Sequence, residues 1–175
     1  MNPQARVLLF TGDGKGKTTA ALGMALRAAG HGLRTLILQF VKHDAKTGEI
    51  AALRQLPLVE IEQHGLGFLP PADSQAFSRH QEAAREGLHR AAQSLKSGRY
   101  ALVILDEVCF AVARGVLTEQ EVVQVVKAAP AGVVVVLTGR GASDGLAALA
   151  DTVTEMRCIK HGLHSGWGAQ EGVEL

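Results

Sequence analysis

A glycine-rich loop between a predicted strand and a predicted helix limits the possible folds of this chain more than any other feature. The loop reads TGDGKGKTT at residues 11–19; the apolar run RVLLF (6–10) precedes it, and an alanine- and leucine-rich segment (19–29) follows. Short aliphatic runs of this kind are typical of buried parallel strands, and the segment after the loop has helical spacing. A strand, a loop and a helix in this order predict the start of a βαβ unit.

The same alternation continues along the chain. It predicts an α/β fold with a single doubly wound, mostly parallel sheet, in one domain over residues 1–175. We expect an irregular glycine-rich tail from about residue 158. The polar residues of the 74–97 helix, Arg90 among them, are expected to face solvent. The further predicted strands are 34–40, 58–63, 100–105, 133–137 and 152–157, and the further predicted helices are 46–56, 74–97, a short stretch up to 114, one starting at 118, and 144–150.

The glycine loop has the composition of an anion-binding site. Glycines between a strand and a helix turn successive backbone amides toward one point, at the positive end of the helix dipole. Lys17 can reach a phosphate oxygen, and Thr18 can place its hydroxyl on a magnesium ion. The first loop glycine is Gly12, because Thr11 stands where the pattern G-x-x-x-x-G-K-[ST] has glycine. A chance glycine turn is the alternative to a P-loop, the nucleotide-binding loop that we predict from Gly12, Asp13, Gly14, Lys15, Gly16, Lys17, Thr18 and Thr19.

Two acids follow a second apolar run. Asp106 and Glu107 come directly after LVIL at 102–105, at the carboxyl end of a predicted strand. The glycine loop lies at the same sheet edge, where open α/β sheets bind ligands, so these acids are candidates for a nucleotide-bound magnesium or manganese ion, directly or through water. The alternative role for Asp106 or Glu107 is to cap the N-terminus of the following helix. Lys42 and Arg140 follow other strands, and they are either phosphate-binding cations or solvated loop residues.

Composition restricts the possible partners and the compartment. The formal net charge is +1 with no run of lysine or arginine, which does not favour a nucleic-acid-binding protein. No segment approaches the roughly 20 apolar residues of a membrane helix. The cysteines Cys109 and Cys158 stand far apart, without the spacing of a zinc site or a disulfide framework. We therefore expect a cytoplasmic protein with no nucleic-acid or membrane partner.

With these segments placed, nearly the whole chain resembles the P-loop type of ATP:cob(I)alamin (corrinoid) adenosyltransferases. The resemblance rests on several motifs together: TGDGKGKTTAALGMALRAAGHG, LQFVK, GE at 48–49, GFLP, VILDEV, LTGRG, LADTVTEM and KH at 160–161. It implies a RecA-like P-loop core and a cytosolic homodimer. The implied reaction moves the 5′-deoxyadenosyl group of ATP to the reduced cobalt of a corrinoid and releases inorganic triphosphate, in adenosylcobalamin synthesis or salvage.

The resemblance also implies roles for single residues. The loop Gly12 to Thr19 would bind the triphosphate of an ATP held in a reversed orientation, and Thr18 and Glu107 would hold magnesium. Phe68 corresponds to an aromatic residue that covers the corrin face, so that Lys17 and Phe68 are the candidate catalytic residues. Pro70 stands where well-known members have a second aromatic residue, a tryptophan. A reductase that supplies electrons to cobalt is the implied protein partner.

Two other functions use the same motifs. A P-loop ATPase or small-molecule kinase would cleave the terminal phosphate, with Glu107 polarising water or a hydroxyl. A nucleotide switch that engages nucleic acid is disfavoured by the low net charge and by only seven aromatic residues (five Phe, one Tyr and one Trp). A Co(I) nucleophile needs no general base, and the sequence offers no nucleophile–base pair, which favours the transferase.

Overall fold

The computed structural model describes residues 4–43 and 47–173. Within these ranges six strands form one sheet in the order β3-β2-β4-β5-β1-β6, and every neighbouring pair is parallel. The prediction of a mostly parallel α/β sheet is therefore confirmed. The strands are β1 (Arg6–Thr11), β2 (Thr35–Gln39), β3 (Val59–Gln63), β4 (Leu102–Asp106), β5 (Val134–Thr138) and β6 (Thr152–Glu155).

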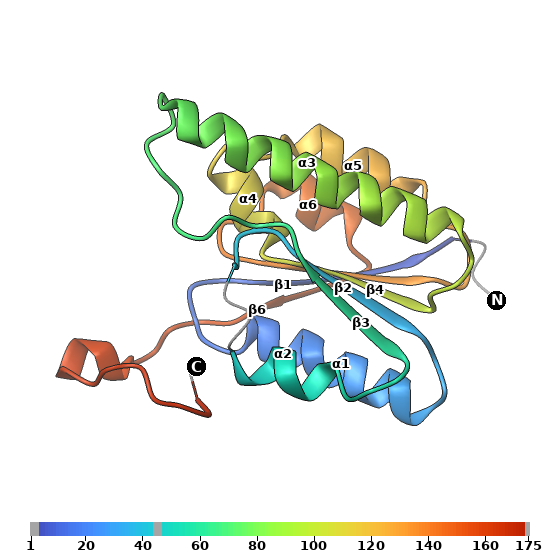
Figure 1. Cartoon of the computed structure of the whole chain (residues 1–175), viewed down its shortest axis with the longest axis horizontal. Helices are drawn as coiled ribbons and strands as arrows, with labels where there is room; N and C mark the ends of the chain where they lie inside the picture. The colour runs from blue at the N-terminus through green and yellow to red at the C-terminus, as the bar shows by residue number, and fades with distance from the viewer. Residues whose placement is uncertain (1–3, 44–46, 174–175) are drawn as a thin grey trace.

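Helices cover both faces of the sheet. Figure 1 shows α1 and α2 on one face and α3, α4, α5 and α6 on the other, which is the doubly wound arrangement that the alternation predicts. The start of the helix expected at 46–56 lies outside the described residues. The helices are α1 (Lys17–Gly30), α2 (Gly48–Leu53), α3 (Gln75–Lys96), α4 (Val108–Ala113), α5 (Glu119–Lys127) and α6 (Asp144–Leu149).

Two apolar layers, one on each face, hold the sheet and helices together. Leu36 and Leu38 of β2 face the layer under α3, whereas Ile37 between them faces the layer under α1. Successive side chains of a strand point to opposite faces, so a strand covered on both sides must be apolar at every position. This explains why the central strands read as continuous aliphatic runs.

The strands place the glycine loop and the acids at the same end of the sheet, where the carboxyl ends of the parallel strands lie. The loop follows β1, Asp106 ends β4 and Glu107 comes directly after it, and β5 lies between these two strands. Thr138 at the end of β5 therefore stands between the loop and the acids.

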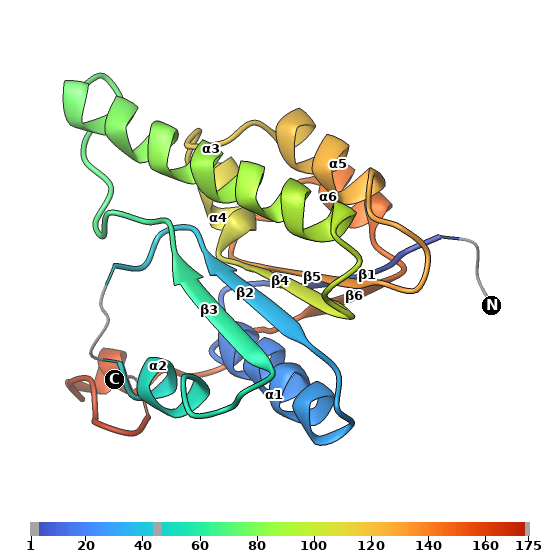
Figure 2. The same cartoon turned by 45° about the vertical axis from the view of Figure 1, so that its right-hand side comes forward.

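The C-terminal segment is less regular than the rest of the described chain. It contains one short 3-10 helix, η1 (Gly162–Ser165), and in the views of Figures 1 and 2 it returns to the side of the molecule where α2 lies. No helix among the described residues is long and apolar enough to cross a membrane.

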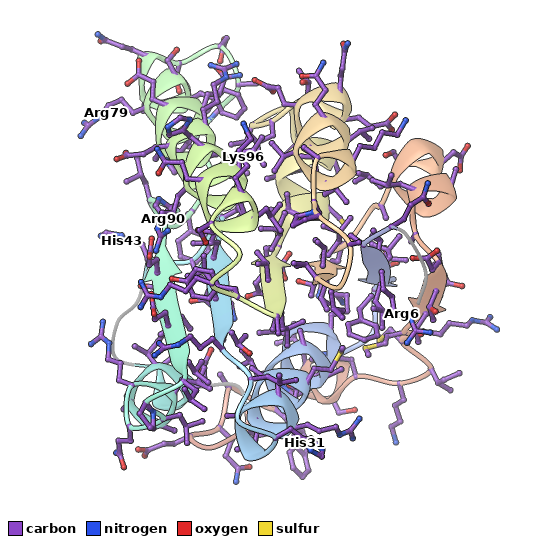
Figure 3. All side chains as sticks on the ribbon, turned by 90° about the vertical axis from the view of Figure 1, so that its right-hand side faces the viewer. Arg6, His31, His43, Arg79, Arg90 and Lys96 are labelled. Atoms are coloured by element: carbon purple, nitrogen blue, oxygen red, sulfur yellow. The ribbon has the colours of Figure 1, made fainter. Side chains whose placement is uncertain are left out.

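The expectation that Arg90 simply faces solvent is wrong. Its Nε lies 3.0 and 3.2 Å from the two carboxylate oxygens of Glu62, and its Nη1 donates to Ser94 Oγ at 2.6 Å. Figure 3 labels Arg90 where α3 passes β3, the edge strand that carries Glu62. A charged side chain on the polar face of a helix thus joins that helix to the sheet.

Candidate functional site

A cavity of about 730 Å³ opens at the carboxyl ends of the strands. Its volume lies in the range of small-molecule sites, and its place is where parallel α/β sheets bind ligands. Glycine-loop residues, two loop cations and two acids share its wall with part of the C-terminal segment. Its lining residues include Gly14, Lys15, Gly16, Lys17, Thr18, Thr19, Val41, Lys42, Glu49, Glu107, Arg140, His161 and Val173.

The conformation of the loop explains its glycines. Gly12 has φ 93° and Gly16 has φ 116°, backbone conformations that glycine adopts without strain. A Cβ on Gly12 would also collide with the carbonyl oxygen of Met156, in the segment that follows β6. Gly14 N donates to the same carbonyl at 2.6 Å. The departure from the usual pattern, with glycine at 12 and threonine at 11, therefore fits a loop that rests against the end of β6.

Lys17 begins α1 and lies at the centre of the loop. Its side chain is nearly buried, and Nζ donates to the carbonyl oxygens of Gly12 at 2.7 Å and Gly14 at 2.6 Å. Burial, and then the nearby charge of Arg140, lower the pKa of Lys17 below its usual 10.5. The ammonium group is thus held among loop atoms on the cavity wall, within reach of an anion bound there.

Asp106 is completely buried and fully engaged. Its Oδ1 accepts hydrogen bonds from Thr18 Oγ1 at 2.8 Å and Thr138 Oγ1 at 2.7 Å, and its Oδ2 accepts from Gln39 Nε2 at 3.1 Å. Lys42 Nζ lies 3.6 Å from Oδ2. Asp106 does not line the cavity, so its effect on a bound ligand passes through Thr18, whose hydroxyl it orients.

Glu107 has the unusual backbone of the site. With φ 61° and ψ 17° it is the only non-glycine residue of positive φ in the described ranges, and its N–H donates to Thr138 Oγ1 at 2.9 Å. The residue precedes α4 but makes no side-chain capping bond, so helix capping does not account for its carboxylate. That carboxylate lines the cavity, where burial, followed by the charge of Asp106, raises its pKa above the usual 4.5.

Cations surround the space in front of these acids. Lys42 and Arg140 both line the cavity, and Lys42 is paired with Glu49 at 3.4 Å. Lys15 Nζ donates to the carbonyl oxygen of Val173 at 2.7 Å, which brings the C-terminal segment onto the loop. A polyanion in the cavity would meet several positive charges and a row of amides, a set that suits a triphosphate.

The oxygen donors at the site fit a magnesium ion that arrives with a nucleotide. Magnesium in proteins is usually held by one or two carboxylates, with phosphates and waters as the other ligands. Thr18 and Glu107 offer a hydroxyl and a carboxylate at the cavity wall, and Asp106 lies behind Thr18. Within the described chain, no group of three or more His, Cys, Asp and Glu residues could hold a metal by itself.

The structure brings most of the predicted site residues together. The loop from Gly14 to Thr19, Lys42, Arg140 and Glu107 share the cavity wall. Gly12, Asp13 and Asp106 lie behind or beside that wall. Phe68 is outside it, fully exposed in the loop after β3.

The sequence places Gln39 and Thr138 at strand ends that face the cleft, but it assigns neither side chain a role. In the structure both side chains bind Asp106. His161 and Val173 also reach the cavity wall, although they lie in the glycine-rich tail. No spacing in the sequence indicates that this tail returns to the loop.

Fold and site together define the class: an α/β protein with a P-loop NTPase-like core, in which a glycine loop after β1 faces acids at the end of β4 across one intervening strand. The sequence profile of the ATP:corrinoid adenosyltransferase family BtuR/CobO/CobP matches residues 4–175. The chain belongs to this family, as its motifs had indicated together.

Curated relatives agree with this assignment along almost the whole chain. A corrinoid adenosyltransferase of Pseudomonas aeruginosa is 41% identical over 169 residues, which are 97% of this chain and 83% of the relative. The corrinoid adenosyltransferase of Escherichia coli is 39% identical over 173 residues, covering 96% of this chain and 84% of the relative. The corrinoid adenosyltransferase CobA of Salmonella typhimurium is 36% identical, with the same coverage.

Proposed function

We propose that this chain transfers the 5′-deoxyadenosyl group of ATP to the Co(I) of a reduced corrinoid, in the synthesis or salvage of adenosylcobalamin. Family membership supports the reaction. The observation that carries the proposal to this chain is the cavity, in which loop amides, Lys17, Lys42 and Arg140 face one space beside Glu107. Such a site suits a nucleotide whose whole triphosphate is the leaving group.

The chemistry asks more of charge and geometry than of acid–base catalysis. Co(I) supplies the electron pair of the new Co–C5′ bond, and the electrons of the C5′–O bond leave with the triphosphate. The protein must hold the reacting carbon in line and stabilise a polyanion. Lys17 and the amides of Gly14 to Thr19 bind the triphosphate in this scheme, with Lys42 and Arg140 at its sides.

Magnesium or manganese would be held by Thr18 and Glu107, with Asp106 orienting the Thr18 hydroxyl. When bound, the ion neutralises part of the triphosphate charge, which makes triphosphate a better leaving group. Burial of Glu107 favours binding of the ion, because a carboxylate in a poorly solvated cavity attracts a cation strongly.

Phe68 is the proposed contact to the corrin ring. Its side chain is fully exposed, where a bound ligand can cover it. The loop that carries it is joined to the loop after β2, because Gly67 N donates to Val41 O at 3.1 Å, and Val41 lines the cavity. Pro70 cannot supply a second aromatic contact, so Phe68 would act without that partner.

We further propose a cytoplasmic homodimer that acts as one domain over residues 1–175 and receives its Co(I) through an electron-donating reductase. The free thiols of Cys109 and Cys158 are compatible with a reducing compartment. The single sheet supports one domain.

The test is phosphorus NMR of ATP incubated anaerobically with the protein, magnesium and chemically reduced cobalamin. Inorganic triphosphate that appears only when corrinoid is present is the expected result, since it requires cleavage of the C5′–O bond. ADP and phosphate formed without corrinoid would instead identify an ATPase or kinase and would reject the proposal.

A further inference from the structure

Four neighbouring strands end in polar residues that lie in one row. β3, β2, β4 and β5 end in Gln63, Gln39, Asp106 and Thr138, and the register pairs Gln63 with Gln39 and Gln39 with Asp106. Side chains two residues apart on a strand share a face. In each strand the residue two positions earlier belongs to the apolar layer under α1, so the row faces the helix that carries Thr18; these earlier residues are Ile61, Ile37, Ile104 and Val136.

Hydrogen bonds join the row in one direction. Gln63 Nε2 donates to Gln39 Oε1 at 2.9 Å, and Gln39 Nε2 donates to Asp106 Oδ2 at 3.1 Å. A carboxylate only accepts, so the amide nitrogen of Gln39 must face Asp106, and its amide oxygen is left for Gln63. The other carboxylate oxygen, Oδ1, is then directed at Thr18 and Thr138.

We propose that Gln39 is a positioning residue of the nucleotide–metal site. It fixes the rotation of the Asp106 carboxylate, which in turn fixes the hydroxyl of Thr18. Because Thr18 donates its hydrogen to Asp106, its oxygen lone pairs stay available to a metal ion. The inference rests on the proposed function in one respect, that Thr18 helps to hold the metal that accompanies ATP.

Burial makes the Gln39 contact decisive. Gln39 and Asp106 are both completely buried, so no water replaces a lost amide donor at low cost. Without that amide, the remaining neighbour of Oδ2 in the described structure is Lys42 Nζ at 3.6 Å, and Lys42 also pairs with Glu49. The carboxylate would then be free to turn toward Lys42 and away from Thr18.

Gln63 should have a weaker effect of the same kind. It acts on Asp106 through Gln39, by holding the amide of Gln39 in the orientation that donates to the carboxylate. It is half-buried on the edge strand, where a substitution is tolerated more easily than at the centre of the sheet. Substitutions in the row should therefore have graded effects on metal-dependent ATP binding, large at Gln39 and small at Gln63.

The experiment is calorimetric titration of ATP into the protein, with magnesium and separately with EDTA. The readout is the magnesium gain, defined as the ratio of the Kd in EDTA to the Kd in magnesium. Gln39→Met should lower this gain about tenfold, with the Kd in EDTA unchanged within about twofold, because a hydrogen bond to a buried charge is lost. Gln63→Met should lower it about two- to threefold.

Gln81→Met is the matched control, because Gln81 donates one amide hydrogen bond to Gly115 O on the surface of α3. Its magnesium gain should equal that of the wild type. A magnesium gain in Gln39→Met equal to that of the wild type would overturn the inference. An equal increase of the Kd in magnesium and of the Kd in EDTA would overturn it as well. If Gln39→Met does not fold, an unchanged gain in Gln63→Met overturns it. The binding readout is separate from the NMR test, so ADP formation would reject the transferase and leave this test standing.

Discussion

Lys17 Nζ and the carbonyl oxygen of Gly14 lie 2.6 Å apart, inside the same loop. The carbonyl of Gly12 accepts from the same ammonium group at 2.7 Å. Phosphate oxygens that enter the cavity must therefore compete with two backbone acceptors, which they can do because charged acceptors form the stronger hydrogen bonds. The lysine holds the loop in shape before a nucleotide binds, and the loop holds the lysine in place.

Lys17→Ala should lower the affinity for ATP by about 100-fold or more, because it removes the charged donor and loosens the loop. Isothermal titration calorimetry with ATP and magnesium measures this directly. Lys127→Ala, at an exposed position near the end of α5, is the control and should bind ATP normally. Retained ATP affinity in Lys17→Ala would show that the loop is not the nucleotide site.

Phe68→Ala should slow the adenosylation of complete cobalamin far more than it weakens ATP binding. The ring is fully exposed, so its removal should change the free energy of unfolding by less than about 0.5 kcal/mol. The measurements are the rate of adenosylcobalamin formation and the Kd of ATP. Leu26→Ala removes another exposed apolar side chain, on α1, and should leave both unchanged. Equal activity of wild type and Phe68→Ala would remove Phe68 from the site.

The sequence was informative where local pattern decides structure. The β1–loop–α1 unit, the buried strand before Asp106 and the Thr118–Glu121 capping box were all predictable, because each depends on neighbours within a few residues. The box is present in the structure: Thr118 Oγ1 accepts from Glu121 N, and Glu121 Oε2 accepts from Thr118 N. The alternation of strand and helix patterns likewise indicated that helices cover both faces of the sheet.

Contacts between distant segments were not predictable. The row from Gln63 to Asp106 depends on which strands are neighbours and in what register, and one sequence does not contain that information. The contact of Gly12 with Met156 and that of Lys15 with Val173 join residues more than 140 positions apart. The αL backbone of Glu107 was also missed, since residues other than Gly, Asn, Asp and His seldom adopt it.

Two glycines of this chain should respond to alanine in opposite directions. A Cβ on Gly65 would collide with the backbone of Val41 and push apart the loops that follow β2 and β3. Gly23 lies inside α1, exposed, with nothing within 4 Å of its would-be Cβ. Gly65→Ala should therefore lower the free energy of unfolding by about 2 kcal/mol or more, and Gly23→Ala should raise it by about 0.5–1 kcal/mol.

Urea unfolding of both variants measures these changes against the wild type. Because Val41 lines the cavity, Gly65→Ala should also weaken ATP binding, whereas Gly23→Ala should bind ATP as the wild type does. Equal stability of the two variants would contradict the close approach of the loops.

Arg90→Leu should destabilise the protein in a way that depends on pH. Burial alone would raise the pKa of Glu62, but the hydrogen bonds from Arg90, with help from His64, lower it below the usual 4.5. In the wild type the ionised carboxylate therefore adds stability that is fully present above pH 4.5 and is lost as the pH falls through the lower, folded-state pKa. Without Arg90 the pKa of Glu62 rises, and that contribution shrinks.

The difference in the free energy of unfolding between wild type and Arg90→Leu should thus be largest at neutral pH. We expect about 1 kcal/mol there, since both side chains are only partly buried, and a progressively smaller difference below about pH 4. Urea unfolding at several pH values between 7 and 3.5 measures it. Arg79→Leu, an exposed arginine of the same helix (Figure 3), is the matched control and should show little difference at any pH. A difference for Arg90→Leu that stays constant over this range would mean that the Arg90 side chain stabilises α3 by packing and not by its charge.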